Sequence, residues 1–465
     1  MANEILPLVN ATDVPTSADA TKNDMRNQQE FCFKTVSNRW KKQLNTLEKS
    51  VENRSKTVIQ IRSFFYKDKL KYRIMNENDT EVFLGLREDG TEVVIKRMSK
   101  SNYEQLKIEE RILQLPKLDN PHIVRYIDAA VDKKFGYLFL QLCEYTLGTY
   151  INKHKEKVFL LKNLAKEFLK SLKVLHCHTP QILHQDLKPE NVWIDVIGRA
   201  KLVFGKQDQE GSYTSNSEIG VAGMLIRHIL SGGKHTFDGK PNNEKEYCLD
   251  HVQDVVAKDL IEWMINKDPK QRPNVKECLD HPFFWNSKQK FEYLRRTGNR
   301  KEVENCQNAD QNLIQLLESC PGLQSHKNWK GKFDLNMVDK LENFKNQTTH
   351  RRLQKKETQQ QNKIEHQVYP KKIQQTKRYP ENVLGLLRFI RNLHEHYAED
   401  ADNCDVIELF PDLFGDVYKF AKDNNWNSQP PLKKMFQGKK DKVDFSTSVV
   451  MASVSTEACE GSSPF

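Results

Sequence analysis

Long apolar stretches, paired cysteines and internal repeats are all missing from this 465-residue sequence. Nothing approaches the roughly 18 apolar residues of a membrane-spanning helix, and no basic segment with a long apolar run opens the chain, so we expect neither a membrane span nor a signal peptide. The nine cysteines include no CxxC pair, which argues against a disulfide framework or a zinc site and favours a cytoplasmic location. The lack of a repeating unit of about 20 to 50 residues excludes a solenoid.

The chain is long enough for two or three folding units. Charged residues make up 29% of the sequence and apolar residues only 37%, which predicts compact domains flanked by solvated segments. The 73 Lys and Arg residues outnumber the 63 Asp and Glu residues, giving a net charge of +10. This excess suits a polyanionic partner or serves solubility.

Composition and periodicity divide the chain into four parts. Residues 1–57 are predicted to hold a disordered leader and one amphipathic helix, from about 28 to 56. Residues 58–285 begin with short β-rich runs, including a hairpin about the turn 88–90 and a buried strand at 137–142, and continue with long helical patterns. Residues 286–436 are mostly helical, and 437–465 form a predicted flexible tail. The strand-rich unit followed by a helix-rich one indicates two lobes with a cleft.

The segment His184–Asn191 reads HQDLKPEN and resembles the protein-kinase catalytic loop HRDLKPEN at all but one position. The resemblance implies that Asp186 accepts a substrate proton and that Asn191 holds a metal ion on nucleotide phosphates. Val93–Lys96 resembles the strand whose lysine binds the α and β phosphates. Its expected partner is Glu110, with Glu109 as the alternative. Cys143 ends a run that resembles the hinge contacting adenine.

Departures from the kinase pattern are concentrated where phosphate and metal are held. Met75, Glu77 and Thr80 stand where kinases carry phosphate-loop glycines, so backbone amides cannot approach phosphate as closely. Val203 replaces the metal-binding aspartate, and an isopropyl group cannot ligate magnesium. The activation segment is short and carries no Ala-Pro-Glu. The lobe is therefore interpreted as a pseudokinase that binds ATP or ADP without turnover, and an active Ser/Thr kinase is the alternative.

Further motifs follow this lobe. The sequence HPFFW at 281–285, the segment NVLGLLRFIRNLHEHY at 382–397 and the segment LFPDL at 409–413 together resemble the kinase-extension nuclease (KEN) domain. That domain lies behind a kinase lobe in the family of the 2-5A-dependent ribonuclease (RNase L) and the inositol-requiring sensor kinase. The resemblance implies an α+β chain: a two-lobed protein-kinase-like fold followed by an all-α KEN ribonuclease domain.

Residues 383–397 have the periodicity of an amphipathic helix. Arg388, Asn392 and His396 recur every four residues on the face opposite the apolar one, so we expect them on one exposed stripe. A cation, an amide and an imidazole in a row suit a phosphodiester, although an ordinary solvated face has the same pattern.

The KEN resemblance implies four catalytic residues and no metal. His396 is the expected general acid, because an imidazole titrates near neutral pH. Arg391 is expected to stabilise phosphate charge, Asn392 to orient the site, and Tyr379 to act as a base or as a positioning hydroxyl. Arg391 and His396 are about 140° apart around an ideal helix. Either the reach of arginine or an early end of the helix must close that gap.

Two features depart from the KEN pattern. Gly385 stands where relatives usually carry an aspartate, six residues before the arginine, so catalysis is weakened if that carboxylate matters. The segment 346–378 holds nine Lys or Arg residues against two Glu, and it is predicted to be a mobile basic loop. The loop would help to capture single-stranded RNA or be a neutral surface feature.

The resemblance thus implies a dimer-activated endoribonuclease that cleaves single-stranded RNA to 2′,3′-cyclic phosphate and 5′-hydroxyl ends. Its expected partners are RNA and a second copy of the chain, with no membrane and no DNA. A catalytically dead RNA-binding scaffold remains an alternative.

Overall fold

The structure, a computed structural model, describes residues 36–77, 80–205, 213–235, 237, 249–343, 378–402 and 404–436. The leader before residue 36, the basic loop apart from Arg378, and the tail from 437 lie outside these ranges, so the predictions for them are not tested. Within the described ranges, no helix combines the length and the apolar character needed to cross a membrane.

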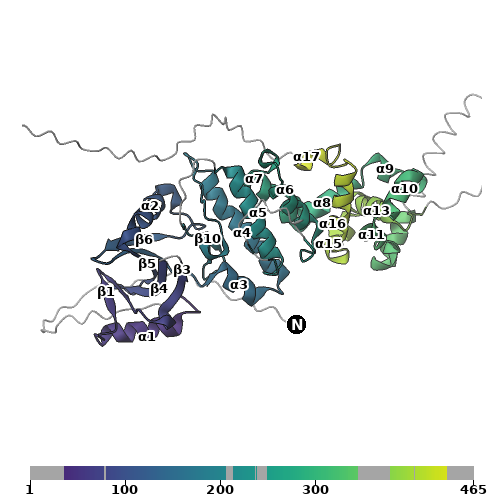
Figure 1. The fold of residues 1–465 in the computed structure, drawn as a ribbon. Coiled ribbons are helices and arrows are strands. Elements are labelled where there is room, and N and C mark those ends of the chain that lie inside the picture. The colour runs from purple at the N-terminus through teal and green to yellow at the C-terminus, as the bar shows by residue number, and fades with distance from the viewer. Residues whose placement is uncertain are drawn as a thin grey trace, which may run out of the picture.

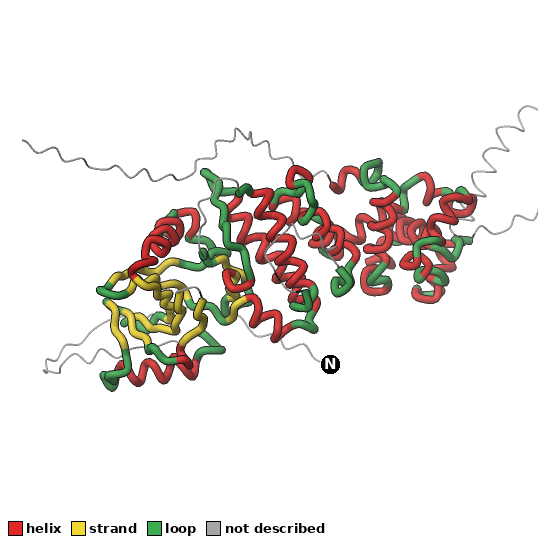
Figure 2. The backbone as a smooth tube through the Cα atoms, viewed as in Figure 1, coloured by secondary structure: helices red, strands yellow, loops and turns green. Residues whose placement is uncertain are grey.

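The N-terminal lobe is built on one seven-stranded antiparallel sheet, which lies at one end of the molecule (Figure 2). The strand order is β1-β2-β4-β5-β7-β6, with β3 paired to β4. Their bounds are β1 (Ile59–Ile61), β2 (Phe64–Tyr66), β3 (Arg73–Glu77), β4 (Thr80–Arg87), β5 (Glu92–Ser99), β6 (Tyr126–Val131) and β7 (Phe135–Gln141). The predicted hairpin about residues 88–90 is confirmed as β4 and β5, and the predicted buried strand is β7. In this register Lys96 lies opposite Val82 and Leu138, in the middle of the sheet.

Two helices flank this sheet. Helix α2 (Tyr103–Leu113) contacts β7, whereas α1 (Lys41–Glu52) contacts β4 (Figure 1). Helix α1 follows the predicted apolar pattern, because Leu44 and Leu47 are fully buried against the sheet. It is shorter than the predicted 28–56, because Ser37–Trp40 precede it as an irregular segment and Asn53 ends it.

The second lobe is mainly helical and carries a small sheet in the order β10-β9-β8 (Figure 1). Its long central helix α4 packs against α5, α7 and β10 and buries nine residues, all of them apolar except Ser171 and His176. The elements are β8 (Tyr145–Thr146), α3 (Leu147–His154), α4 (Val158–His176), β9 (Val192–Ile194), β10 (Ala200–Leu202), α5 (Ser215–Leu230), α6 (Val255–Met264) and α7 (Val275–Asp280).

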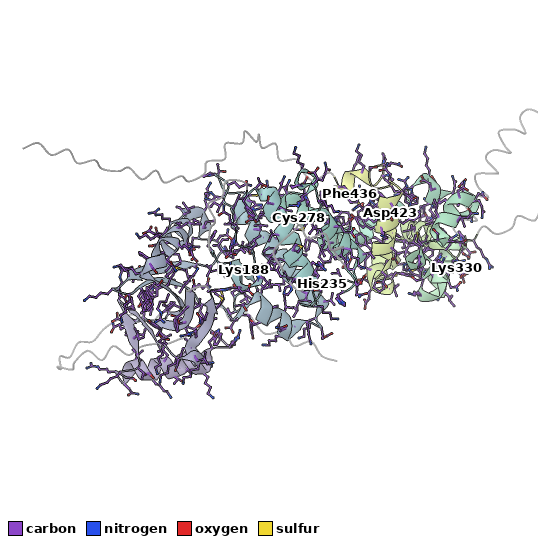
Figure 3. The ribbon with its side chains drawn as sticks, in the orientation of Figure 1. Lys188, His235, Cys278, Lys330, Asp423 and Phe436 are labelled. Atoms are coloured by element: carbon purple, nitrogen blue, oxygen red, sulfur yellow. The ribbon has the colours of Figure 1, made fainter. Side chains whose placement is uncertain are left out.

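A third, all-helical region follows directly. Its helices are α8 (Ser287–Thr297), α9 (Lys301–Glu304), α10 (Gln311–Glu318), α11 (Pro321–Gln324), α13 (Val383–His396), α14 (Ala398–Asp402), α15 (Val406–Leu409), α16 (Leu413–Asp423) and α17 (Lys433–Phe436). The expected architecture, an α+β two-lobed kinase-like fold followed by an all-α domain, is confirmed. In Figure 3, Lys188 lies where the two lobes meet and Lys330 lies near the end of the molecule opposite the sheet.

The helical region packs tightly on the second lobe. The ring of Trp285 lies 5.9 Å from the rings of both Tyr293 on α8 and Phe414 on α16. Asp259 on α6 accepts hydrogen bonds from Tyr418 (2.6 Å) and from Lys422 of α16. Apolar and charged contacts therefore hold the two parts in one orientation.

Candidate functional site

The chain enters α13 through a close backbone contact. The side chain of Asn382 caps the helix by accepting a hydrogen bond from the Gly385 N–H at 3.0 Å. A Cβ atom placed on Gly385 would lie only 1.9 Å from the carbonyl oxygen of Pro380. That carbonyl also accepts a hydrogen bond from the indole N–H of Trp329 (3.2 Å). Glycine therefore lets the Tyr379–Pro380 backbone lie against the first turn of α13, which fixes the position of Tyr379.

A continuous chain of hydrogen bonds runs from Tyr379 to the surface. The amide Nδ2 of Asn392 donates to the Tyr379 hydroxyl at 2.6 Å, and its Oδ1 accepts from Nη1 of Arg391 at 2.9 Å. Arg391 in turn donates from Nε to Oδ1 of Asn299 at 2.8 Å. The guanidinium is therefore held from two sides, as a group that must meet phosphate oxygens needs to be.

The structure brings Tyr379, Asn392 and Arg391 together as expected, but it does not place them on one exposed stripe. Tyr379 is only 2% exposed and Asn392 only 8%. The prediction that Arg388, Asn392 and His396 form an exposed row is wrong for Asn392, because the Tyr379 side chain covers its amide. Burial raises the pKa of the Tyr379 phenol, although the bond from Asn392 opposes the shift. A buried phenol with a raised pKa is suited to positioning rather than to proton abstraction.

Arg388 contributes mainly to the packing of α13 on α8. It donates from Nη1 to the carbonyl oxygen of Gly298 at 3.1 Å and lies 3.5 Å from a carboxylate oxygen of Glu304. Burial lowers its pKa, as does the nearby charge of Arg391. Arg388 and Arg391 lie on one helix, and their two positive charges together attract an anion to this surface.

His396 is the last residue of α13 and its side chain is exposed. Partial burial lowers its pKa, and the charges of Arg391 and Arg388 lower it further, while Glu395 opposes them. The helix continues to His396, so an early helix end does not close the gap to Arg391. The described hydrogen bonds of Arg391 go to Asn299 and Asn392, so the reach of its side chain toward the imidazole stays a prediction. The neighbouring Glu395 is held by Arg295 at 2.6 Å.

Asn299 is a site residue that sequence reasoning did not assign. It follows Gly298, whose α-carbon faces α13 so closely that a Cβ would lie 2.6 Å from the Cβ of Arg391. The only local signal was a Thr-Gly-Asn turn after a helical pattern, which is common at helix ends. Its contact with Arg391 joins positions 92 residues apart and has no signature in sequence spacing.

The kinase-like cleft contains the predicted lysine, but its partner differs from the preferred one. Lys96 forms an ion pair with Glu109, and both side chains are less than 10% exposed. Glu110 instead accepts hydrogen bonds from Tyr126 and Gln114, each at 3.2 Å. The expectation of a Lys96–Glu110 pair is therefore wrong. Glu109 lies on the buried face of α2, and Glu110 is rotated about 100° from it. Burial raises the pKa of Glu109, and Lys96 opposes the shift.

Asp186 and Asn191 lie together at the catalytic-loop position. The Asn191 amide donates to the Asp186 carboxylate at 2.8 Å. A Cβ on Gly205 would lie 2.0 Å from that carboxylate, so the aspartate occupies the space in front of the Val203–Gly205 segment. Val203 is 2% exposed and belongs to the core. Among the described residues, no group of three or more His, Cys, Asp or Glu side chains is arranged to hold a metal.

The hinge residue Cys143 is 6% exposed, and its carbonyl oxygen accepts a hydrogen bond from Trp40 at 3.3 Å. A cavity of about 610 Å³ lies behind the hinge. It is lined by side chains such as Arg87 and Arg125 and not by Lys96, Asp186 or Asn191, so it is separate from the kinase-like cleft.

Comparison with known proteins matches the two parts of the chain separately. The protein kinase domain matches residues 78–219, and the ribonuclease 2-5A family matches residues 290–436. A 2-5A-dependent ribonuclease from Mus musculus is 24% identical over 420 residues, which cover 85% of this chain and 52% of the relative. The sensor for unfolded proteins in the ER ire1 from Schizosaccharomyces pombe is 26% identical over 427 residues, covering 74% and 37%.

The serine/threonine-protein kinase/endoribonuclease IRE1 from Oryza sativa is 27% identical over 391 residues, covering 72% of this chain and 39% of the relative. The chain thus spans about half or less of the length of these relatives. The two matches follow the order of the fold. The protein kinase match lies in the two kinase-like lobes, and the ribonuclease 2-5A match lies in the helical region behind them. The chain therefore combines a protein kinase domain with a ribonuclease 2-5A (KEN) domain behind it, and it is similar to 2-5A-dependent ribonucleases and to IRE1 kinase/endoribonucleases.

Proposed function

We propose that this chain is an endoribonuclease that cleaves single-stranded RNA without a metal ion. The observation that carries the proposal is the hydrogen-bonded chain from Tyr379 through Asn392 to Arg391, on the helix that ends at the exposed His396. A fixed guanidinium and a titratable imidazole supply charge stabilisation and proton transfer at one phosphodiester. The endoribonuclease names of relatives support the same reading.

The proposed reaction is an internal transesterification. The ribose 2′-hydroxyl gives up its proton to solvent as its oxygen bonds to the adjacent phosphorus. The bond from phosphorus to the 5′-oxygen breaks, and that oxygen takes a proton from His396. Arg391 stabilises the charge on the non-bridging oxygens, while Asn392 and Tyr379 hold Arg391 in place. The products are a 2′,3′-cyclic phosphate and a 5′-hydroxyl.

The proposal includes a homodimer as the active form, which rests on the family resemblance, and a cytoplasmic location, which rests on the cysteine pattern. A dimer predicts that specific activity rises with enzyme concentration. The kinase-like lobe is proposed as a scaffold rather than a kinase, because Val203 cannot ligate magnesium.

The test is cleavage of an end-labelled single-stranded RNA by the purified chain in EDTA. We expect cleavage to be lost in His396→Ala and retained in His394→Ala, a matched exposed histidine on the same helix. A substrate with a 2′-deoxy residue at the cleavage site should resist cutting. Tight RNA binding with no cleavage by the wild-type chain would contradict the proposal and favour a binding scaffold. Equal activity of His396→Ala and the wild type would also contradict it.

A further inference from the structure

Residues 36–40, which we call the hinge clasp, lie across the hinge of the kinase-like lobes. The backbone N–H groups of Val36 and Ser37 donate to the two carboxylate oxygens of Glu92 at 3.1 and 2.9 Å. Those of Asn38 and Arg39 donate to the two oxygens of Glu144 at 3.0 and 2.8 Å. Four successive amides are thus bound by two carboxylates, one on β5 and one in the hinge.

The side chains of the clasp add contacts to the hinge backbone. Arg39 donates from Nη1 to the carbonyl oxygen of Glu144 at 2.8 Å, and the indole N–H of Trp40 donates to the carbonyl oxygen of Cys143. The guanidinium carbon of Arg39 lies 4.4 Å from the ring centre of Trp40 and 4.8 Å from that of Tyr145. A cation between two aromatic rings is held by cation–π attraction on both faces.

Helix α1 anchors the clasp from its other end. The helix begins directly after Trp40, and its Leu44 and Leu47 are fully buried with Leu84 and Leu86 of β4. The clasp is therefore tied to the sheet by the helix and to the hinge by its own hydrogen bonds.

Little space remains beneath the clasp. The cavity there measures about 40 Å³. It is lined by Arg39, Ile74, Val94, Cys143, Glu144, Tyr145, Thr146, Thr149 and Trp193. Val94 and Cys143 come from the strand and the hinge that resemble the adenine-contacting parts of a kinase. Small-molecule sites usually measure about 300 to 1,000 Å³, so the space left while Arg39 lies over the hinge is too small for a purine base.

The phosphate end of the cleft keeps the lysine–glutamate pair of a kinase but lacks the metal-binding aspartate. The ammonium group of Lys96 pairs with the carboxylate of Glu109. It also donates a hydrogen bond to the carbonyl oxygen of Phe204 at 2.9 Å. The Asp186 carboxylate lies against Gly205. Because the Val203 side chain has no oxygen to ligate magnesium, the phosphate end offers a lysine for phosphate but one metal ligand fewer than a kinase.

We propose that the hinge clasp closes the adenine region of the kinase-like cleft from within the same chain, so that ATP or ADP enters only when the clasp leaves. The clasp uses the Cys143 carbonyl and covers the hinge with Arg39, so an adenine base competes with it for the same space. Apparent affinity for a nucleotide is then reduced by the fraction of molecules whose clasp is open.

The test is calorimetric titration of the full chain with ATP and with ADP, with and without magnesium. We expect the double variant Arg39→Ala/Trp40→Ala to bind at least about tenfold more tightly than the wild type. Arg125→Ala, an exposed arginine on the same side of the hinge, is the control and should behave like the wild type. Equal affinity of the wild type and the double variant would overturn the proposal, and so would absence of binding by both.

Hydrogen exchange tests the clasp independently of any variant. Because four amides are bound by Glu92 and Glu144, the N–H groups of residues 36–39 should exchange much more slowly in the wild-type chain than unprotected amides. Exchange at the rate of an unstructured peptide would overturn the proposal even if the double variant failed to fold.

Discussion

Replacement of Gly385 by alanine should damage both the stability and the activity of the nuclease domain. The new Cβ would overlap the carbonyl oxygen of Pro380, which lies 1.9 Å from its ideal position. The backbone on both sides must shift, because the overlapping atom belongs to the main chain and not to a flexible side chain. Replacement by aspartate, which relatives carry here according to the resemblance, introduces the same Cβ and should have at least the same effect.

The size of the effect follows from three contributions. Alanine is preferred over glycine within a helix by about 1 kcal/mol, which favours the variant. Overpacking costs about 1 to 3 kcal/mol. Displacing Tyr379 and Pro380 weakens the hydrogen bonds from Asn392 and from Trp329, each worth about 1 kcal/mol. We therefore expect a net loss of about 1 to 3 kcal/mol in the free energy of unfolding.

Activity should fall more steeply than stability. A shift of about 1 Å in a catalytic group costs about 100-fold in rate, and Tyr379 holds Asn392, which holds Arg391. Urea unfolding and RNA cleavage by the folded protein would measure the two effects. The control is Gly148→Ala on α3, where a Cβ meets nothing within 4 Å, so stability should be equal or higher by up to about 1 kcal/mol and activity should be unchanged. If Gly385→Ala were as stable and as active as the wild type, the argument from close contact would be refuted.

Three further predictions concern the same domain and its junction with the second lobe. Tyr379→Phe leaves the buried Asn392 amide without its acceptor, so urea unfolding should show a loss of about 1 to 3 kcal/mol, with slower cleavage; unchanged values would contradict the role of the hydroxyl. The pKa of His396 is lowered, so the imidazole loses its proton at a pH below the usual value of about 6.5. Because cleavage needs the protonated form, kcat/KM should fall as the pH rises through this lowered pKa. Glu395→Gln removes the charge that opposes the shift, so the fall should move to still lower pH, and a move to higher pH would be inconsistent with this assignment. Asp259→Ala removes the partner of Tyr418 and Lys422 on α16 and of His281 in the second lobe. It should cost about 2 to 3 kcal/mol in thermal or urea unfolding, whereas an unchanged midpoint would show that the contact contributes nothing.

Local patterns predicted the elements that carry the site. The apolar spacing of α13 and the short β-rich runs of β4 and β5 depend on neighbours in sequence, and the helix and the hairpin are both confirmed. Neighbours in sequence could not decide whether Glu109 or Glu110 pairs with Lys96. The pairing depends on which face of α2 meets β5, and adjacent residues on a helix differ by about 100°.

Long-range contacts explain what the sequence could not reveal. Asn299 reaches Arg391 only because α8 packs on α13, and Asn392 is buried only because Tyr379 folds back over it. Gly385 was interpreted as a missing carboxylate. The structure gives it a steric role instead, since the Pro380 carbonyl lies where a side chain would begin.

The continuous apolar core at the junction has a consequence for dissecting the protein. Phe283, Phe284 and Trp285 end the kinase-like part, yet they are buried in the same core as Tyr293 and Phe414 of the helical domain. A fragment starting at Asn286 would uncover several aromatic rings at once and should aggregate or bind other apolar surfaces. The nuclease half is thus not a detachable module, and tests of cleavage call for the two halves in one polypeptide.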